Sequence, residues 1–165
     1  MSPALGQVII REFEPGDESA FRQLNEEWIT RYFEIEARDA EIINHPQECI
    51  LTPGGRIFFA VLDGRCVGCC ALIPAGQGEL EVAKMAVTAA CQGMGIGRRI
   101  LHAVVDAARS AGARRLHLET NHVLAPAIHL YESIGFRRVA PDHVVPSAYV
   151  RADVFMEMAL DTPRG

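Results

Sequence analysis

One stretch of the chain, Glu81–Arg99, limits the possible folds more than any other. It opens as a strand, with apolar residues at Val82, Met85 and Val87, and passes through a glycine-rich run at 93–97 into an amphipathic helix. Such a turn leaves backbone N–H groups unpaired at the helix start and adds the positive end of the helix dipole. The stretch therefore predicts a bound anion at the turn, most often a phosphate.

The spacing of the glycines excludes two phosphate-binding motifs. Counting from either of the first two glycines, no glycine falls where the dinucleotide fingerprint needs its third, and no lysine follows as in a nucleotide-hydrolase loop. The pattern that fits is Gln92-x-x-Gly95-x-Gly97, with Arg98 and Arg99 in the first helical turn. Cations there oppose the dipole and indicate an anion nearby. A glycine-rich connection with two solvated arginines is the alternative interpretation.

A second motif lies downstream. Asn121 is followed by residues 125–136, APAIHLYESIGF, which contain Tyr131 and then Gly135-Phe136. The two motifs, in this order, resemble those of the GNAT superfamily of acyl-CoA-dependent N-acetyltransferases. The resemblance covers roughly residues 81–136, and the flanking pattern is compatible over most of the chain.

The order of the expected elements predicts the fold class. Strands are expected at 7–13, 56–62, 65–73, from 79 to 87, 114–119, 136–140 and 150–160, and helices at 18–33, 36–44, 94–111 and 125–133. Hairpin connections join the second to fourth strands into an antiparallel meander, whereas a long helix before the fifth predicts a parallel neighbour. We expect an α/β (α+β) fold, with a mixed, mostly antiparallel sheet of six to seven strands and helices on both faces.

Length and charge narrow the function classes. The 165 residues are expected to form a single N-acetyltransferase domain, 1–165, and the net charge of −5 argues against a nucleic-acid partner. No apolar run approaches about 18 residues, so no membrane association is expected, and the N-terminus lacks the pattern of a secretory signal. The oligomeric state stays open between monomer and homodimer.

The cysteines and histidines predict neither a disulfide framework nor a metal site. Five cysteines are an odd number, and reduced thiols suit a cytoplasmic protein. Cys66 and Cys69 have redox-type spacing but fall within an expected strand, where buried core thiols are the favoured interpretation. His117, His122 and His129 lack metal-ligand spacing.

The resemblance implies two catalytic residues. Tyr131 would lie beside the sulfur as general acid, and the alternative is a helical aromatic that packs into the core. Glu81 occupies the position where many family members place a carboxylate base, because an alkylamine is mostly protonated at neutral pH. The alternative for Glu81 is an exposed strand carboxylate.

The resemblance also implies how acetyl-CoA binds. The backbone of Met85, Ala86 and Val87 would bond the pantetheine arm, and the Val87 N–H would stabilise the developing oxyanion. Asn121 would bond the pantetheine amides, unless it is only a turn residue or helix cap. The expected pyrophosphate-binding residues are Gln92, Gly93, Met94, Gly95, Ile96, Gly97 and Arg98, and Ala127 and Tyr131 complete the cofactor site.

The sequence indicates the residues that bind the acceptor less clearly than those that bind acetyl-CoA. In the family the first two helices line this site, so Trp28, Tyr32 and Phe33 are substrate-contact candidates, although aromatic residues at helical spacing are often simply core. The predicted activity is direct transfer of an acetyl group from acetyl-CoA to a primary amine, on a small molecule or a protein. A non-catalytic acyl-CoA or CoA sensor on the same fold is the alternative.

Overall fold

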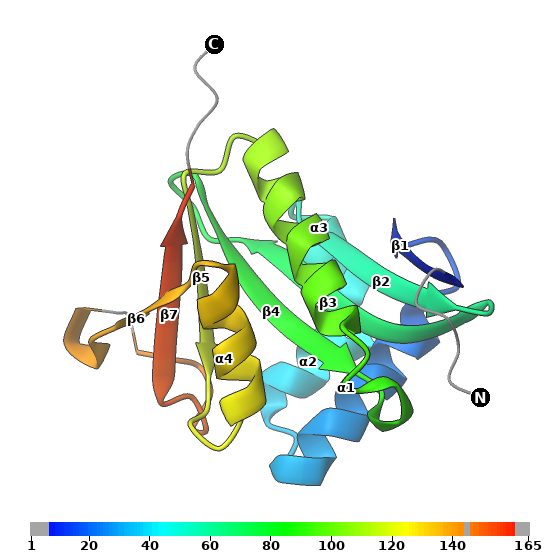
Figure 1. Cartoon of the computed structure of the whole chain (residues 1–165). Helices are drawn as coiled ribbons and strands as arrows, with labels where there is room; N and C mark the ends of the chain where they lie inside the picture. The colour runs from blue at the N-terminus through cyan, green and yellow to red at the C-terminus, as the bar shows by residue number, and fades with distance from the viewer. Residues whose placement is uncertain (1–6, 144–145, 161–165) are drawn as a thin grey trace.

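A computed structural model describes residues 7–143 and 146–160. A seven-stranded sheet with the order β1-β2-β3-β4-β5-β7-β6 runs through this part of the chain (Figure 1). The strands are β1 (Val8–Glu12), β2 (Arg56–Leu62), β3 (Arg65–Pro74), β4 (Glu79–Val87), β5 (Arg115–Thr120), β6 (Arg137–Val139) and β7 (Val154–Ala159). The helices are α1 (Glu18–Tyr32), α2 (Ala37–Asn44), α3 (Ile96–Ser110) and α4 (Ala125–Ile134).

Pairing within the sheet confirms the predicted mixed topology. β1 to β4 pair in antiparallel order, β4 and β5 are parallel, and β7 pairs antiparallel with both β5 and β6. The parallel pair follows from the crossover through α3, since parallel strands need a long connection. The fold class is thus the expected mixed, mostly antiparallel sheet.

Two apolar cores, one on each face of the sheet, explain the near-continuous apolar strands. On one face, Phe58 and Cys70 pack against residues of α3 and α4; on the other, Phe59 and Cys69 pack against α1 and α2. Successive side chains of a strand point to opposite faces, so a strand covered on both faces has no polar face. Figure 1 shows α3 and α4 on the near face of the sheet.

Two expected boundaries differ from the structure by more than one residue. α3 begins at Ile96 rather than 94, because Gly95 has a left-handed backbone with φ of 77° and forms the helix N-cap. β7 begins at Val154 rather than 150, because the preceding segment bonds to α2 instead of to the sheet: the Val150 N–H donates to Glu36, and Arg151 pairs with Asp39.

The five cysteines are free thiols, and of the pair expected to be buried, Cys66 and Cys69, only Cys69 is fully so. Cys69, Cys70 and Cys91 are buried, whereas Cys49 and Cys66 are half-buried. Burial raises the pKa of Cys66 and of Cys69 above the ordinary thiol value, which disfavours the reactive thiolate. The pair with redox-type spacing therefore belongs to the packing of β3.

Candidate active site

A gap in the sheet between β4 and β5 creates the main cavity. The two strands pair only over Glu79–Glu81 and Arg115–His117, and they diverge beyond that point (Figure 1). The register of β3 against β4 shifts where Lys84 has a positive φ of 54°, so β4 carries a bulge. A bulge bends its strand and increases the local twist. The backbone of Met85, Ala86 and Val87 therefore lines a cavity of about 720 Å³ instead of pairing with β5.

The glycine-rich turn closes one end of this cavity. Gly93 and Gly95 have φ of 82° and 77°, a region that glycine enters without strain. α3 starts there with no side chain capping its first N–H groups, so they stay available to an anion. At Gly97 the constraint is space, because an added Cβ would lie 3.2 Å from Leu130 Cδ2 on α4.

Hydrogen bonds brace the segment between β4 and the turn. Gln92 Nε2 donates to the Val87 carbonyl at 3.2 Å. The Glu27 carboxylate on α1 accepts from Thr88 Oγ1 at 3.1 Å and from the Ala89 N–H at 2.9 Å. The sequence carried no signal for Glu27, because this contact joins residues 61 positions apart.

Tyr131 lies on α4 with its side chain against the cavity. The ring is 8% exposed and packs edge-on against Phe136, with 6.0 Å between the ring centroids. Burial raises the pKa of the Tyr131 phenol above its ordinary value, so the group stays protonated at neutral pH. The side chain both packs in the core and lines the cavity, so its role as general acid stays a prediction.

Glu81 and Glu119 stand on the two diverging strands and both line the cavity. Burial, and then the charge of Glu119, raises the pKa of Glu81 to about 7. Oε2 of Glu119 is buried and has no hydrogen-bond partner among the described residues. Glu81 is therefore not the exposed strand carboxylate of the alternative, and Glu119 is a cavity-lining candidate that the sequence analysis missed.

A buried charge cluster adjoins the cavity, whose lining includes Lys84 and Arg151. Asp39 on α2 is fully buried; it accepts from Lys84 Nζ at 2.7 Å and from Arg151 at 2.6 Å through both of its oxygens. Lys84 Nζ also lies 3.0 Å from the Tyr149 hydroxyl. Burial alone would raise the pKa of Asp39, but the bonds from Arg151 and Lys84 outweigh it and hold the pKa at about 2.

Asn121 makes the contacts of a turn residue. Its Nδ2 donates to the Arg151 carbonyl at 2.7 Å, and its Oδ1 accepts from the Val123 N–H at 2.9 Å. The side chain thus holds the segment after β5 to the segment before β7. It lines the cavity as well, so a contact to a ligand stays a prediction.

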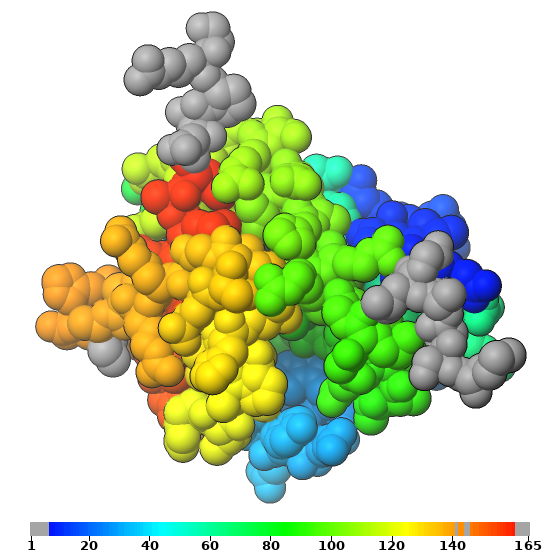
Figure 2. All heavy atoms as spheres, viewed as in Figure 1, coloured from blue at the N-terminus to red at the C-terminus, as the bar shows by residue number. Residues whose placement is uncertain are grey.

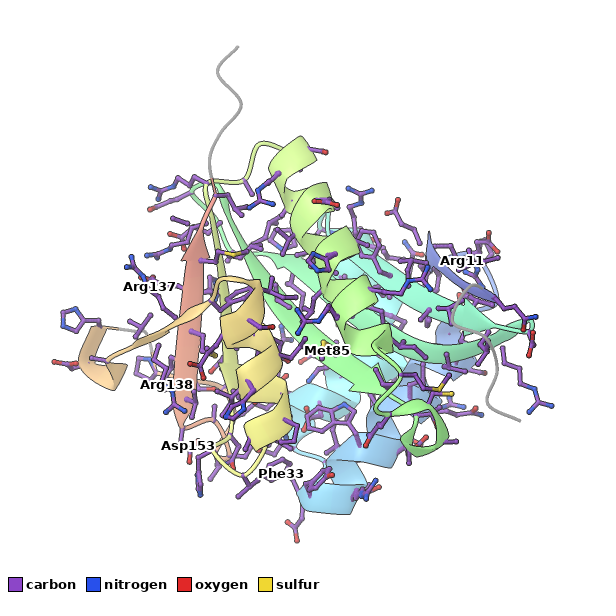
Figure 3. All side chains as sticks on the ribbon, in the orientation of Figure 1. Arg11, Phe33, Met85, Arg137, Arg138 and Asp153 are labelled. Carbon is purple, nitrogen blue, oxygen red and sulfur yellow. The ribbon has the colours of Figure 1, made fainter. Side chains whose placement is uncertain are left out.

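The aromatic candidates of α1 and its C-cap residue gather at the other end of the cavity. Trp28, Tyr32 and Phe33 line it, with Trp28 and Phe33 edge to face at 6.4 Å. The Arg151 guanidinium lies 5.7 Å from both of these rings. In Figure 3, Met85 lies on β4 below the first turn of α3, and Phe33 lies beyond the end of that strand.

The structure brings together almost all the predicted site residues. The exception is Met94, whose side chain packs against the larger core and is not among those that line the cavity. Figure 2 shows the surface hollowed where α4, the turn before α3 and the first two helices meet. In residues 7–143 and 146–160, no three His, Cys, Asp or Glu side chains are grouped to hold a metal ion.

Comparison with known proteins gives the family. The model of the Acetyltransferase (GNAT) family matches residues 20–136. Mycothiol acetyltransferase of Thermomonospora curvata is 34% identical over 139 residues, which are 82% of this chain and 46% of that protein. The chain thus spans about half the length of this curated relative. It belongs to the GNAT family of acetyltransferases.

Solved structures agree on the fold. An acetyltransferase of the GNAT family from Staphylococcus aureus Mu50 aligns with a TM-score of 0.85 at 18% identity, covering 93% of this chain and 99% of that one. N-acetylglutamate synthase from Neisseria gonorrhoeae, solved with coenzyme A and N-acetyl-glutamate, aligns with a TM-score of 0.70 at 21% identity over 93% of this chain and 35% of that one. No helix in the described part of the chain has the length and apolarity needed to cross a membrane.

Proposed function

We propose that this protein transfers an acetyl group from acetyl-CoA to a primary amine, by direct attack while both substrates are bound. The observation that carries the proposal is the single cavity that joins the uncapped, glycine-rich start of α3 to Glu81 and Tyr131. A site for an anion at one end and an acid–base pair further along match a donor with a pyrophosphate and a reactive thioester.

The residues present fit acetyl-CoA. The backbone of Met85, Ala86 and Val87, which does not pair with β5, would bond the pantetheine arm as an added strand does, and the N–H groups of residues 93–98 would hold the pyrophosphate. Gly97 leaves the space between α3 and α4 that a side chain would fill. Gln92, Ala127 and Asn121 would contribute from the cavity walls.

The chemistry assigns one role to each group. When bound, acetyl-CoA supplies an activated acetyl thioester. Glu81, with a pKa of about 7, accepts the proton that the acceptor amine must lose. The Val87 N–H donates to the carbonyl oxygen where negative charge develops. Tyr131 donates its phenolic proton toward the departing sulfur. Because a thiol is a stronger acid than a phenol, this transfer costs free energy, and the hydrogen bond itself supplies part of the stabilisation.

The acceptor is a small-molecule or protein amine that reaches Glu81 past Trp28 and Tyr32. Free cysteines throughout the described residues support a reducing, cytoplasmic setting. Glu81 and Tyr131 in one cavity favour an enzyme over a CoA sensor, since a sensor needs neither group.

A panel of primary amines with acetyl-CoA tests the proposal. Release of free thiol, together with an acetylated amine in the mass spectrum, is the expected result. Tight binding of acetyl-CoA with no thiol released by any amine would instead support the sensor.

A further inference from the structure

The charges that line the cavity are not balanced. Each of its cations has a partner: Arg38 bonds Glu41 at 2.9 Å, Lys84 bonds Asp39, Arg98 bonds Ser133 at 2.9 Å, and Arg151 bonds Asp39 and Glu36. The two carboxylates on the diverging strands, Glu81 and Glu119, have no hydrogen-bond partner in the described part of the chain. Arg98, in the first turn of α3, has a neutral hydroxyl as its partner, whereas the other three cations are paired with carboxylates. On the diverging strands, at Glu81 and Glu119, the unpaired charge is therefore negative.

Glu119 carries the strongest signal of a missing ligand. Its Oε2 is the only buried side-chain nitrogen or oxygen of the described residues that lacks a partner. A buried carboxylate oxygen without a hydrogen bond is costly, unless a ligand satisfies it during function. An ammonium group offers both the opposite charge and N–H donors.

We propose that Glu119 binds the ammonium group of a cationic alkylamine acceptor and forms with Glu81 a carboxylate pair that removes its proton. This inference rests on the proposed function. In the proton step an N–H bond of the ammonium breaks, an O–H bond forms on Glu81, and the amine keeps the electron pair it needs for attack. The acceptor class is then a primary alkylammonium, rather than an uncharged aromatic amine or an anionic amine.

The surroundings of the pair support this assignment of roles. The titratable and charged groups that face it come from α2, β4, β5 and the segment before β7: they are Arg38, Lys84, His117 and Tyr149. Lys84 and Arg38 lower the pKa of Glu81, but burial and the charge of Glu119 outweigh them. Burial, together with the charge of Glu119, thus keeps Glu81 basic enough to take a proton near neutral pH.

Carbon-13 NMR of protein labelled at the glutamate carboxyl groups tests the pair without turnover. In the wild type one carboxyl should titrate near neutral pH, and Glu81→Gln should remove that signal. Glu119→Gln should move it lower by about one pH unit, because a like charge has been removed. The matched control is Glu79→Gln on the same strand, whose carboxylate is neutralised by Arg115 at 2.7 Å. A Glu81 titration unchanged in Glu119→Gln would overturn the pair.

Kinetics test the ammonium contact. With the best alkylamine of the panel, Glu119→Gln should raise KM tenfold or more, and Glu79→Gln should leave it unchanged. An unchanged KM in Glu119→Gln would overturn the inference, as would a wild-type protein that acetylates only uncharged amines. That second result would leave the proposed acetyltransferase intact. Binding of acetyl-CoA with no acetylation of any amine would contradict both.

Discussion

Burial of Tyr131 serves both the core and the chemistry. The ring fills space between α4 and the sheet, and the low polarity around it keeps the phenol protonated. A general acid must carry its proton when the leaving group departs, so the buried position suits the proposed role.

Tyr131→Phe removes only the hydroxyl. We expect kcat to fall by about 10²-fold, the lower range for a lost acid–base group, with the affinity for acetyl-CoA unchanged. Thiol release gives kcat, and titration calorimetry gives the affinity. A variant with wild-type kcat would exclude Tyr131 as the acid, and thermal unfolding checks that the core is intact.

The raised pKa of Glu81 predicts a pH profile. Glu81 acts in its deprotonated form, so kcat at saturating amine should rise with pH and level off above about pH 7. Below that pH, kcat should fall about tenfold per unit. Glu81→Gln should abolish this dependence, whereas Glu79→Gln should keep it. A wild-type profile that is flat between pH 5 and 8 would contradict the assignment of the base.

The candidate site residues that could be predicted from the sequence are those in local motifs. The glycine-rich turn and Tyr131 stand in short patterns that are visible in the chain itself. Glu119 and Asp39 gain their roles from neighbours far away in the sequence; Asp39 meets Arg151 across 112 positions. Nothing in the local pattern distinguishes such residues from solvated surface acids.

The start of α3 carries the proposed anion site and also packs against α4 and β4. Gly97 faces Leu130 on α4 and, at 3.6 Å, the Met85 side chain on β4. A larger residue there pushes the first turn of α3 away from the cavity wall. The turn depends on Gly93 and Gly95 for its backbone conformation and on Gly97 for its place.

Gly97→Val should therefore weaken acetyl-CoA binding by tenfold or more in titration calorimetry. The branched side chain would press on Leu130 and Met85 and displace the first turn of α3, whose N–H groups are proposed to hold the pyrophosphate. His102→Val, at an exposed position of the same helix, controls for the lower helix propensity of valine. Equal affinity for acetyl-CoA in the two variants would contradict the assignment of the glycine-rich turn as the pyrophosphate-binding motif.

The helices and strands could be predicted where the spacing of apolar residues and the turn residues indicate the same element. The meander from β2 to β4 and the parallel β5 follow from hairpin signals and one long crossover. The bulge at Lys84 was not predictable, because no glycine marks it and the partners of its buried Nζ, Asp39 and Tyr149, are distant in the sequence. That bulge lies where β4 turns away from β5.

Across the whole molecule, Asp39 joins parts that are distant in the chain. Its carboxylate links α2 to β4 through Lys84 and to the segment before β7 through Arg151. Removing one partner of a buried charge cluster leaves the remaining charges unsatisfied, which costs far more than a surface ion pair.

Asp39→Asn should lower the free energy of unfolding by about 3–5 kcal/mol in urea titrations, because the buried Lys84 loses its counter-charge and Arg151 loses one of its two. Asp106→Asn, on the exposed face of α3, should change it by less than about 0.5 kcal/mol. A similar small loss in both variants would show that the cluster adds little to stability.

The low pKa of Asp39 predicts how the free energy of unfolding changes at acid pH. Its pKa is about 2 in the folded protein against 3.8 for an aspartate side chain free in water, so the folded state binds fewer protons. The stability that Asp39 contributes is present above pH 3.8 and is lost as the pH falls toward 2. Asp39→Asn should flatten the slope of unfolding free energy in that window, and an unchanged slope would contradict the role of Asp39.

Titration calorimetry with acetyl-CoA, CoA and a CoA that lacks the ribose phosphate tests the acetyl-CoA assignment most directly. We predict micromolar binding that largely survives the loss of that phosphate, because the turn before α3 is proposed to hold the pyrophosphate instead. No binding at millimolar ligand would contradict the assignment, and the proposed acetyltransferase and the CoA sensor would both be excluded.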